Sequence, residues 1–342
     1  MTEHFWLGMA IIIVSGGLNG SFPLPMKYAR QWRWENTWLV FSLTALLVLP
    51  WILALGFVPQ LGELYREAPT RMILIPLIFG FLWGIAQTTF GLSIKAVGMA
   101  CAFAVVSGLG CLLGSLIPIL TSNTADLFRP RGLLLLASLP ILLPGLVLYS
   151  MAGRRREKEQ ATGASPADAA AMSFAAGLAI TIFTGVFGAN LNLGFHFGHG
   201  LVQRGLELGG NPATSTYPVW ALVLPAGLLP NVFYCVYLLF RNGTWSAFRT
   251  SGWAKECALA IAMALLWLGG IVCYGIGATL VGRYGTSVGF ALFSASIILA
   301  ANVGGILTGE WKSTSARTRR LLTVGMTAIL IAIVVLNLGG LF

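Results

Sequence analysis

The chain has 342 residues, of which 57% are hydrophobic and 9% are charged, and its formal net charge is +10. A soluble chain carries about 25% charged residues, so this composition excludes a water-soluble globule. It also excludes a disordered chain, which needs low hydrophobicity. The basic excess does not indicate nucleic-acid binding, because too little polar surface remains for such a face. The composition therefore predicts an integral membrane protein.

Ten apolar runs follow one another along the chain, each close to the roughly 20 residues that a membrane-spanning helix needs. The first begins at Phe5 with no basic segment before it, so we expect a retained span and not a cleaved signal peptide. The predicted spans are roughly 5–24, 37–56, 71–96, 99–120, 132–151, 172–195, 214–240, 253–281, 285–308 and 321–341.

The longest polar stretch, residues 153–168, separates the fifth predicted span from the sixth. It divides the chain into a first five-helix repeat (1–151), a cytoplasmic linker (152–171) and a second five-helix repeat (172–342). Because five is odd, the second repeat enters the membrane inverted relative to the first. The predicted fold is therefore all-α, with ten transmembrane helices in two inverted repeats, an architecture found in many secondary transporters.

An internal repeat supports this division. Segments 82–98 and 266–282 both read Leu-Trp-x6-aromatic-Gly-x6-Gly, at a constant offset of 184 residues. Trp83 and Trp267 each stand twelve residues after the basic residue that opens their span. At 1.5 Å per residue, each lies about 18 Å along its helix, near the bilayer midplane. We therefore expect the two indoles to form two walls of a central site.

The basic residues sort unequally between the two sets of loops, with fifteen on the linker side and six on the side of the termini. Cytoplasmic loops of membrane proteins are enriched in Lys and Arg. This distribution predicts a membrane protein with the linker in the cytoplasm and both termini on the opposite side of the membrane.

Several amide side chains fall inside predicted spans, where polar groups are costly and often functional. Carboxamides can donate and accept hydrogen bonds, and aromatic faces beside them suit the C–H face of a sugar ring. This inventory fits a neutral polyol substrate within the lipid bilayer. Alternatively, each amide hydrogen-bonds a neighbouring helix as packing. The candidate substrate-binding residues are Asn19, Trp83, Gln87, Phe90, Asn192, Asn231, Trp267 and Tyr274.

Motifs for catalysis, metal binding and cofactors are not evident. His196 and His199 stand three residues apart, but no Cys, Asp or Glu lies within sequence reach to complete a metal site. They are read as packing or pore-lining residues, with a proton relay as the alternative. We expect no catalytic residue, no metal and no cofactor. Paired glycines such as Gly16/Gly20 and Gly80/Gly84 are predicted to be helix-contact surfaces.

Three sequence blocks resemble the bacterial L-rhamnose–proton symporter family within the drug/metabolite transporter superfamily. They are Pro25-Met-Lys followed by Trp32-x-Trp-Glu-x-x-Trp38, then Phe79-Gly-x-x-Trp83-Gly84, and last Gly309-Glu-Trp311. The resemblance runs nearly end to end. It implies a secondary active transporter that imports L-rhamnose or a related deoxyhexose or monosaccharide with a proton by alternating access.

One feature departs from the pattern that this resemblance implies, since the ninth predicted span carries no acidic residue for coupling. The remaining proton-coupling candidates are Glu35, His196, His199 and Glu310, all near membrane ends. A sodium-coupled transporter, an uncoupled sugar transporter and a drug/metabolite-type exporter stay open as alternatives. A membrane-embedded enzyme is disfavoured, because a nucleophile–base–metal set is not evident in the sequence.

Overall fold

The computed structural model describes residues 5–122, 128–161, 173–211, 214–281 and 288–338, and within these ranges the chain is helical, with no strand. The side chains of some helical residues, among them Asn192 and His196, lie outside this description. The helices are α1 (Phe5–Ser21), η1 (Pro25–Tyr28), α2 (Trp34–Leu43), η2 (Thr44–Val48), α3 (Leu49–Phe57), α4 (Leu61–Glu67), α5 (Thr70–Val97), α6 (Met99–Ser122), α7 (Pro130–Ala161), α8 (Phe174–Gly188), α9 (Asn190–Phe197), α10 (His199–Glu207), α11 (Tyr217–Asn242), η6 (Thr244–Arg249), α12 (Trp253–Val281), α13 (Val288–Leu307) and α14 (Ala316–Leu338).

Within the described residues, eight helical segments are long and apolar enough to cross a membrane. Two shorter apolar helices, Met99–Gly110 and Leu292–Leu307, lie where the fourth and ninth spans were predicted. The chain is thus a multi-pass helical membrane protein, as its composition predicts. The count of ten spans stays a prediction. The eight segments are Phe5–Tyr28, Trp34–Phe57, Thr70–Val97, Gly132–Arg156, Phe174–Glu207, Tyr217–Asn242, Trp253–Val281 and Ala316–Leu338.

The chain forms two compact units, and each is assembled from separate parts of the sequence. Unit 1 comprises Met1–Ser21, Thr89–Val186 and Gly270–Phe342, and unit 2 comprises Phe22–Thr88 and Phe187–Gly269. Helices α5 and α12 each begin in unit 2 and end in unit 1. The predicted division into two repeats, 1–151 and 172–342, concerns the order of the sequence and not these compact units, and it stays a prediction.

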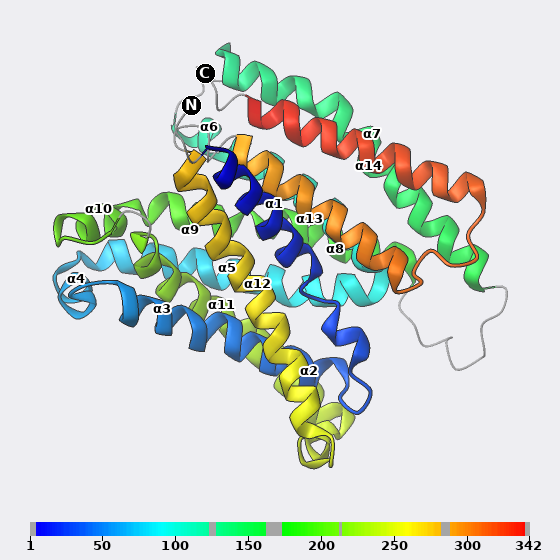
Figure 1. Cartoon of the computed structure of the whole chain (residues 1–342), viewed down its shortest axis with the longest axis horizontal. Helices are drawn as coiled ribbons and strands as arrows, with labels where there is room; N and C mark the ends of the chain where they lie inside the picture. The colour runs from blue at the N-terminus through cyan, green and yellow to red at the C-terminus, as the bar shows by residue number, and fades with distance from the viewer. Residues whose placement is uncertain (1–4, 123–127, 162–172, 212–213, 282–287, 339–342) are drawn as a thin grey trace. The chain divides into compact units, whose positions relative to one another are not determined.

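In unit 1, α7 and α14 run side by side, and α1 lies along α13 (Figure 1). Gly16 and Gly20 of α1 face α13 closely, and a Cβ added to Gly16 would lie 2.7 Å from the carbonyl oxygen of Phe293. A Cβ on Gly325 of α14 would lie 2.6 Å from the amide nitrogen of Tyr149 on α7. Small residues therefore let these helix backbones approach, which confirms the predicted role of the Gly16/Gly20 pair.

In unit 2, α2, η2 and α3 pack against α11. The first part of α5 also meets α11, because Gly80 lies against the backbone of Val223 and Gly84 against that of Gly227. A Cβ on Gly80 would lie 2.8 Å from the Cα atom of Val223. The Gly80/Gly84 pair is therefore a helix-contact surface, as predicted.

Two predicted spans are interrupted in ways that hydropathy alone does not reveal. The second contains a π-helical turn, η2, just before Pro50. Proline lacks an N–H and its ring crowds the carbonyl four residues earlier, so the helix widens there. The sixth is broken after Gly188, giving α8 and α9, and beyond its predicted end a second break at Gly198 separates α10. The amide of Asn190 donates to the carbonyl of Phe187 at 2.8 Å and so satisfies one carbonyl near the first break.

The segment predicted to start the polar linker is helical at its beginning, because α7 continues to Ala161. The sequence after Arg156 is rich in Glu, Lys and Gln, which favour helix. The continuation also has a tertiary contact. Glu159 accepts hydrogen bonds from the Ser315 amide at 2.8 Å, the Ser315 hydroxyl at 2.7 Å and the Thr318 hydroxyl at 2.7 Å. This carboxylate thus ties the end of α7 to the start of α14.

The Glu159 contact should make stability depend on pH. Hydrogen bonds from Ser315 and Thr318 hold the pKa of Glu159 below its usual value of 4.5. Because the folded state favours the ionised form, the stabilisation is present above the unfolded pKa and is lost as pH falls through the folded pKa. We expect Glu159→Gln to lower the thermal midpoint at about pH 6, and the difference from wild type to shrink below about pH 4. Glu63→Gln, an exposed carboxylate on α4, is the control; an equal change there would contradict the prediction.

The α5–α11 contact can be tested with two glycine substitutions. Gly84→Ala places a methyl group into the Gly227 backbone, and overpacking of this kind costs about 1–3 kcal/mol. Gly56→Ala, in α3, meets nothing within 4 Å and should leave stability unchanged or slightly raised. Thermal unfolding in detergent compares them. Equal midpoints for the two variants would show that α5 and α11 do not pack this closely.

Candidate functional site

Trp83 of α5 and Trp267 of α12 lie in contact in unit 2. Their rings stack with centroids 6.0 Å apart and planes inclined by 25°. The two residues are only 5% and 6% exposed. The structure therefore brings the predicted pair together, but as one stacked pair and not as two separated walls, because direct ring contact buries both apolar faces.

Close helix packing sets the position of Trp83. A Cβ added to Gly227 on α11 would lie 2.8 Å from the Trp83 ring, so the indole rests directly on the α11 backbone. Gly84, the next residue on α5, meets the same turn of α11. The small residues of both helices thus leave room for a large aromatic side chain at this crossing.

Helix α2 adds a second set of aromatic rings to the pair. Trp34 stacks on Trp38 at 5.3 Å with a 17° inclination, and Trp38 contacts Phe41 at 4.9 Å. Phe41 in turn meets Trp267 edge to face at 6.4 Å. These five rings, Trp34, Trp38, Phe41, Trp83 and Trp267, form a continuous group that we call the aromatic cluster.

Sequence reasoning did not select the three α2 rings as site residues. Trp34, Trp38 and Phe41 have the spacing i, i+4 and i+7, which is also the spacing of Trp83, Gln87 and Phe90. This spacing places residues on one face of a helix. The signal was therefore present in the sequence, and Trp34 and Trp38 belong to a block that carries the family resemblance.

Asn231 of α11 is buried and uses its amide within the helix packing. Its Nδ2 donates to the carbonyls of Gly84 at 3.2 Å and Gly227 at 2.9 Å. Its Oδ1 accepts from the indole N–H of Trp38 at 3.0 Å. Both N–H groups are thus used, so Asn231 fixes Trp38 and joins α2, α5 and α11. Direct substrate contact by Asn231 stays a prediction, and these bonds favour a positioning role.

Gln87 lies one turn after Trp83 on α5 and is 5% exposed. Its Nε2 is buried and has no hydrogen-bond partner within the described part of the chain. A buried amide nitrogen without a partner costs free energy, so such groups in native proteins call for a specific explanation, such as a ligand or an ordered water. Gln87 is therefore a predicted substrate-binding amide whose donor is available within the described part of the chain.

The candidates Asn19, Phe90 and Tyr274 belong to unit 1. The Phe90 ring meets Phe103 edge to face at 5.0 Å, and the Tyr274 ring stacks on Phe293 at 4.7 Å. Asn19 is 7% exposed and lies against α12, where a Cβ on Gly270 would come within 2.9 Å of the Asn19 Cβ. Their predicted roles in binding are not tested by these contacts.

The two histidine candidates differ in what can be described. The side chains of His196 and of the substrate candidate Asn192, both on α9, lie outside the described part of the structure. His199, at the start of α10, is exposed, and its Nε2 lies 2.9 Å from the Gln203 amide nitrogen. That contact is within one helix, at the i to i+4 spacing.

Glu35 is a proton-coupling candidate that occupies a structural position. It is 4% exposed in the first turn of α2. Its Oε1 accepts from the Asn242 amide at 2.9 Å and from the Thr244 hydroxyl at 3.0 Å. Because both donors lie where α11 ends and η6 begins, Glu35 joins α2 to that junction.

Glu310 is the centre of a cluster in unit 1. Its Oε1 accepts from the Met99 amide at 3.0 Å, at the N-terminus of α6, and its Oε2 lies 3.6 Å from Arg156 Nη1. Arg156 also donates to the carbonyl of Val97 at 2.7 Å and lies 5.0 Å from the centre of the Trp311 ring. A carboxylate at a helix N-terminus is favourable, and the guanidinium neutralises it. The cluster therefore accounts structurally for both buried charges.

The arrangement in unit 2 has the groups for non-covalent binding of a ligand. The described residues hold no group of three or more His, Cys, Asp or Glu that could ligate a metal. The aromatic cluster supplies apolar faces, and Gln87 supplies a hydrogen-bond donor. These features define a multi-pass helical membrane protein with a buried aromatic and amide centre.

Comparison with known proteins identifies the family. The family described as L-rhamnose-proton symport protein (RhaT) matches residues 1–341, so the chain belongs to it. The L-rhamnose-proton symporter of Mannheimia succiniciproducens is 25% identical over 327 residues, covering 93% of both chains. Those of Cronobacter sakazakii and Klebsiella pneumoniae are each 22% identical over 346 residues, covering 99% of both chains. No solved structure matches the chain. The resemblance inferred from the sequence blocks is thus confirmed.

Proposed function

We propose that this protein imports L-rhamnose or a related deoxyhexose or monosaccharide together with a proton, by alternating access. The observation that carries the proposal is family membership over nearly the whole chain, together with the printed names of the relatives. The aromatic cluster and the available Gln87 donor support a neutral, polyhydroxylated substrate, because such a molecule has apolar C–H faces and several hydroxyl acceptors.

Within this proposal, Gln87 hydrogen-bonds a substrate hydroxyl, and Trp83 and Trp267 offer aromatic faces to the sugar ring. Opening the Trp83–Trp267 stack would expose those faces to the sugar. The stacked form therefore corresponds to a closed state of the proposed substrate site. Asn231 acts through Trp38, whose indole it holds. Direct contacts from the remaining candidates, Asn19, Phe90, Asn192 and Tyr274, are part of the proposal, with Phe90 and Tyr274 stacking or gating.

The proposed topology has ten spans, two inverted repeats and both termini on the periplasmic side of the inner membrane. Packing of α2 on α11, α6 on α13 and α7 on α14 supports the repeats, since each pair joins elements that the 184-residue offset makes equivalent. A membrane-impermeant thiol reagent applied to intact cells should label Thr2→Cys, and it should label Lys312→Cys only after permeabilisation. The reverse pattern, or equal labelling of both, would refute this orientation.

Uptake by proteoliposomes tests the transport activity. Labelled L-rhamnose should accumulate inside vesicles when an inward proton gradient is imposed, and accumulation should stop when the gradient is collapsed. Equilibration of the labelled sugar without accumulation would indicate an uncoupled transporter. Accumulation that depends on a sodium gradient would show that sodium, and not the proton, is the coupling ion. The exporter alternative would be favoured by two results together. The protein would transport none of a panel of deoxyhexoses, and it would transport an amphipathic metabolite in inverted vesicles.

The coupling residue can be sought among the four candidates by the same assay. Glu35→Gln, His196→Gln, His199→Gln and Glu310→Gln should each be compared for uptake with and without the gradient. A coupling residue, once neutralised, should leave downhill sugar exchange in place while removing gradient-driven accumulation. A variant that loses both activities points instead to a structural role.

A further inference from the structure

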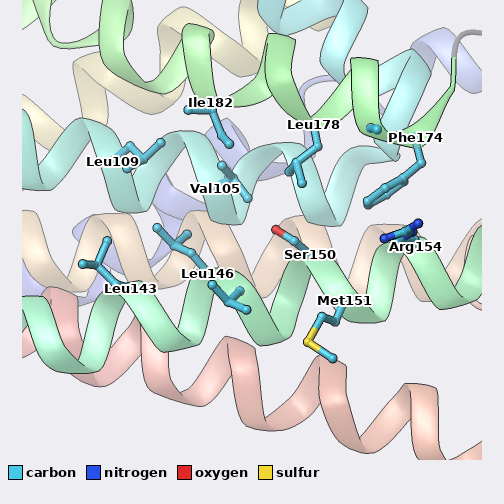
Figure 2. Close-up of a pocket in the computed structure, with 12 residues that line it drawn as sticks. Val105, Leu109, Leu143, Leu146, Ser150, Met151, Arg154, Phe174, Leu178 and Ile182 are labelled. Atoms are coloured by element: carbon cyan, nitrogen blue, oxygen red, sulfur yellow. The ribbon is translucent and has the colours of Figure 1, made fainter.

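A cavity in unit 1 is lined by residues of α6, α7 and α8 (Figure 2). Its volume is about 570 Å³. Figure 2 shows Phe174 and Arg154 at one end and Leu109 and Leu143 at the other. We call this cavity the α7–α8 groove. Its lining residues are Val105, Leu109, Leu143, Leu146, Val147, Ser150, Met151, Arg154, Phe174, Ala175, Leu178 and Ile182.

The lining of the groove is chemically asymmetric. Apart from Ser150 and Arg154, every residue along it is apolar. Arg154 is exposed and stands at one end, and Ser150 is one helical turn further in. A ligand that matches this pattern has a long apolar part, an ester or hydroxyl acceptor near one end, and an anionic group at that end.

The length of the groove matches one leaflet of a bilayer. Leu143 and Arg154 are eleven residues apart on α7, which corresponds to about 16 Å along the helix. Half of a 30 Å hydrocarbon core is about 15 Å. A chain that fills the groove would therefore reach from the headgroup region to the bilayer centre.

From this geometry and charge we propose that the α7–α8 groove binds one acyl chain of an anionic phospholipid, with its phosphate at Arg154. Two neighbouring basic residues at this end of α7 lie outside the lining: Arg155 is half-buried and Lys158 is exposed. Arg156 does not contribute, because its guanidinium is directed to Glu310 and Val97. Glu159, the described acid nearby, is held by Ser315 and Thr318.

The occupied groove would act as a wedge between α7 and α8. These helices are consecutive in the sequence and their lining residues belong to the same unit, so a lipid between them would stabilise their separation. The inference is independent of the proposed transport function, because lipid binding is measured without sugar.

Native mass spectrometry of the full-length protein in detergent provides the test. Palmitoyl-oleoyl phosphatidylglycerol is titrated against palmitoyl-oleoyl phosphatidylcholine, and we expect the phosphatidylglycerol adduct to dominate in wild type. Arg154→Gln should weaken that adduct about fivefold, since one basic residue near the membrane surface contributes about that much to binding an anionic lipid. Lys158→Gln, one helical turn further along α7 and outside the lining, is the matched control and should have a smaller effect.

A second pair of variants tests the groove itself. Ala175→Trp fills the groove from α8, and Ala176→Trp places the same bulk on the next exposed residue, which does not line it. The first should reduce binding of both lipids and the second should not. Circular dichroism and size exclusion show that each variant is folded.

Several outcomes would overturn the proposal. Equal losses for Arg154→Gln and Lys158→Gln would indicate diffuse surface charge, and unchanged binding in Ala175→Trp would place the lipid elsewhere. Equal retention of the two lipids by the wild-type protein would show that the groove does not select an anionic headgroup. A dimer in the same spectra that Ala175→Trp dissociates would assign the groove to a second copy of this chain.

Discussion

Gln87→Leu should lower sugar uptake and, at the same time, leave the thermal stability of the protein unchanged or raised. The amide nitrogen of Gln87 is buried and has no hydrogen-bond partner within the described residues, so replacing it by an apolar group of similar size removes an unsatisfied donor. If that donor serves a substrate hydroxyl, its loss should raise the substrate concentration for half-maximal uptake about tenfold. The measurements are proteoliposome uptake across substrate concentrations and thermal unfolding in detergent.

The opposite signs of the two effects make this test specific. A packing role for Gln87 would lower stability and uptake together, and a surface role would change neither. Glu63→Gln, on the exposed side of α4, is the control and should leave uptake unchanged. Trp83→Phe keeps a ring against Gly227 but reduces the stacking area with Trp267. This variant should therefore moderately raise the substrate concentration for half-maximal uptake. Normal uptake in Gln87→Leu would remove this residue from the substrate site.

The positions of Trp83 and Trp267 show what the sequence can and cannot supply. Their repeat motif and helical depth predicted that the two indoles form two walls of a central site, and the structure places them in one stacked pair. Their direct stacking was not predictable, because the Trp83 ring rests on the backbone of α11 and its place follows from how closely α5 approaches that helix. That approach is set by glycines whose partners, Val223 and Gly227, belong to a distant segment.

The amide residues give the complementary lesson. Sequence reasoning treated Gln87 and Asn231 alike, since both are carboxamides inside apolar helices. The structure separates them, because Asn231 is bonded to Trp38, Gly84 and Gly227, whereas the Gln87 nitrogen has no such partner in the described part. Hydrogen-bond satisfaction is a property of neighbours in space, so no pattern along one helix could distinguish the two.

Arg156→Met should be among the most destabilising substitutions in the chain. Arg156 and Glu310 have side chains only 10% and 13% exposed, and removing one partner of a buried pair costs about 3–5 kcal/mol because the other charge is left uncompensated. Arg156 also bonds the Val97 carbonyl and lies over Trp311, so its loss reaches three contacts at once. The thermal midpoint should fall steeply, whereas Lys158→Met, an exposed lysine on the same helix, should change it little.

A double-mutant cycle, combined with uptake assays, distinguishes a stabilising ion pair between Arg156 and Glu310 from a proton-coupling role of Glu310. Glu310→Gln keeps an acceptor for the Met99 amide, so it should cost less than Arg156→Met, and combining the two should cost less than the sum of the single changes. Additive costs would show that the two side chains do not interact. We expect Glu310→Gln to retain gradient-driven uptake at a lowered stability, because the cluster holds the N-terminus of α6 and accounts for the buried charge. Loss of accumulation with intact downhill exchange would instead make Glu310 the coupling group, and the Arg156 contact would then be a bond that protonation of Glu310 weakens.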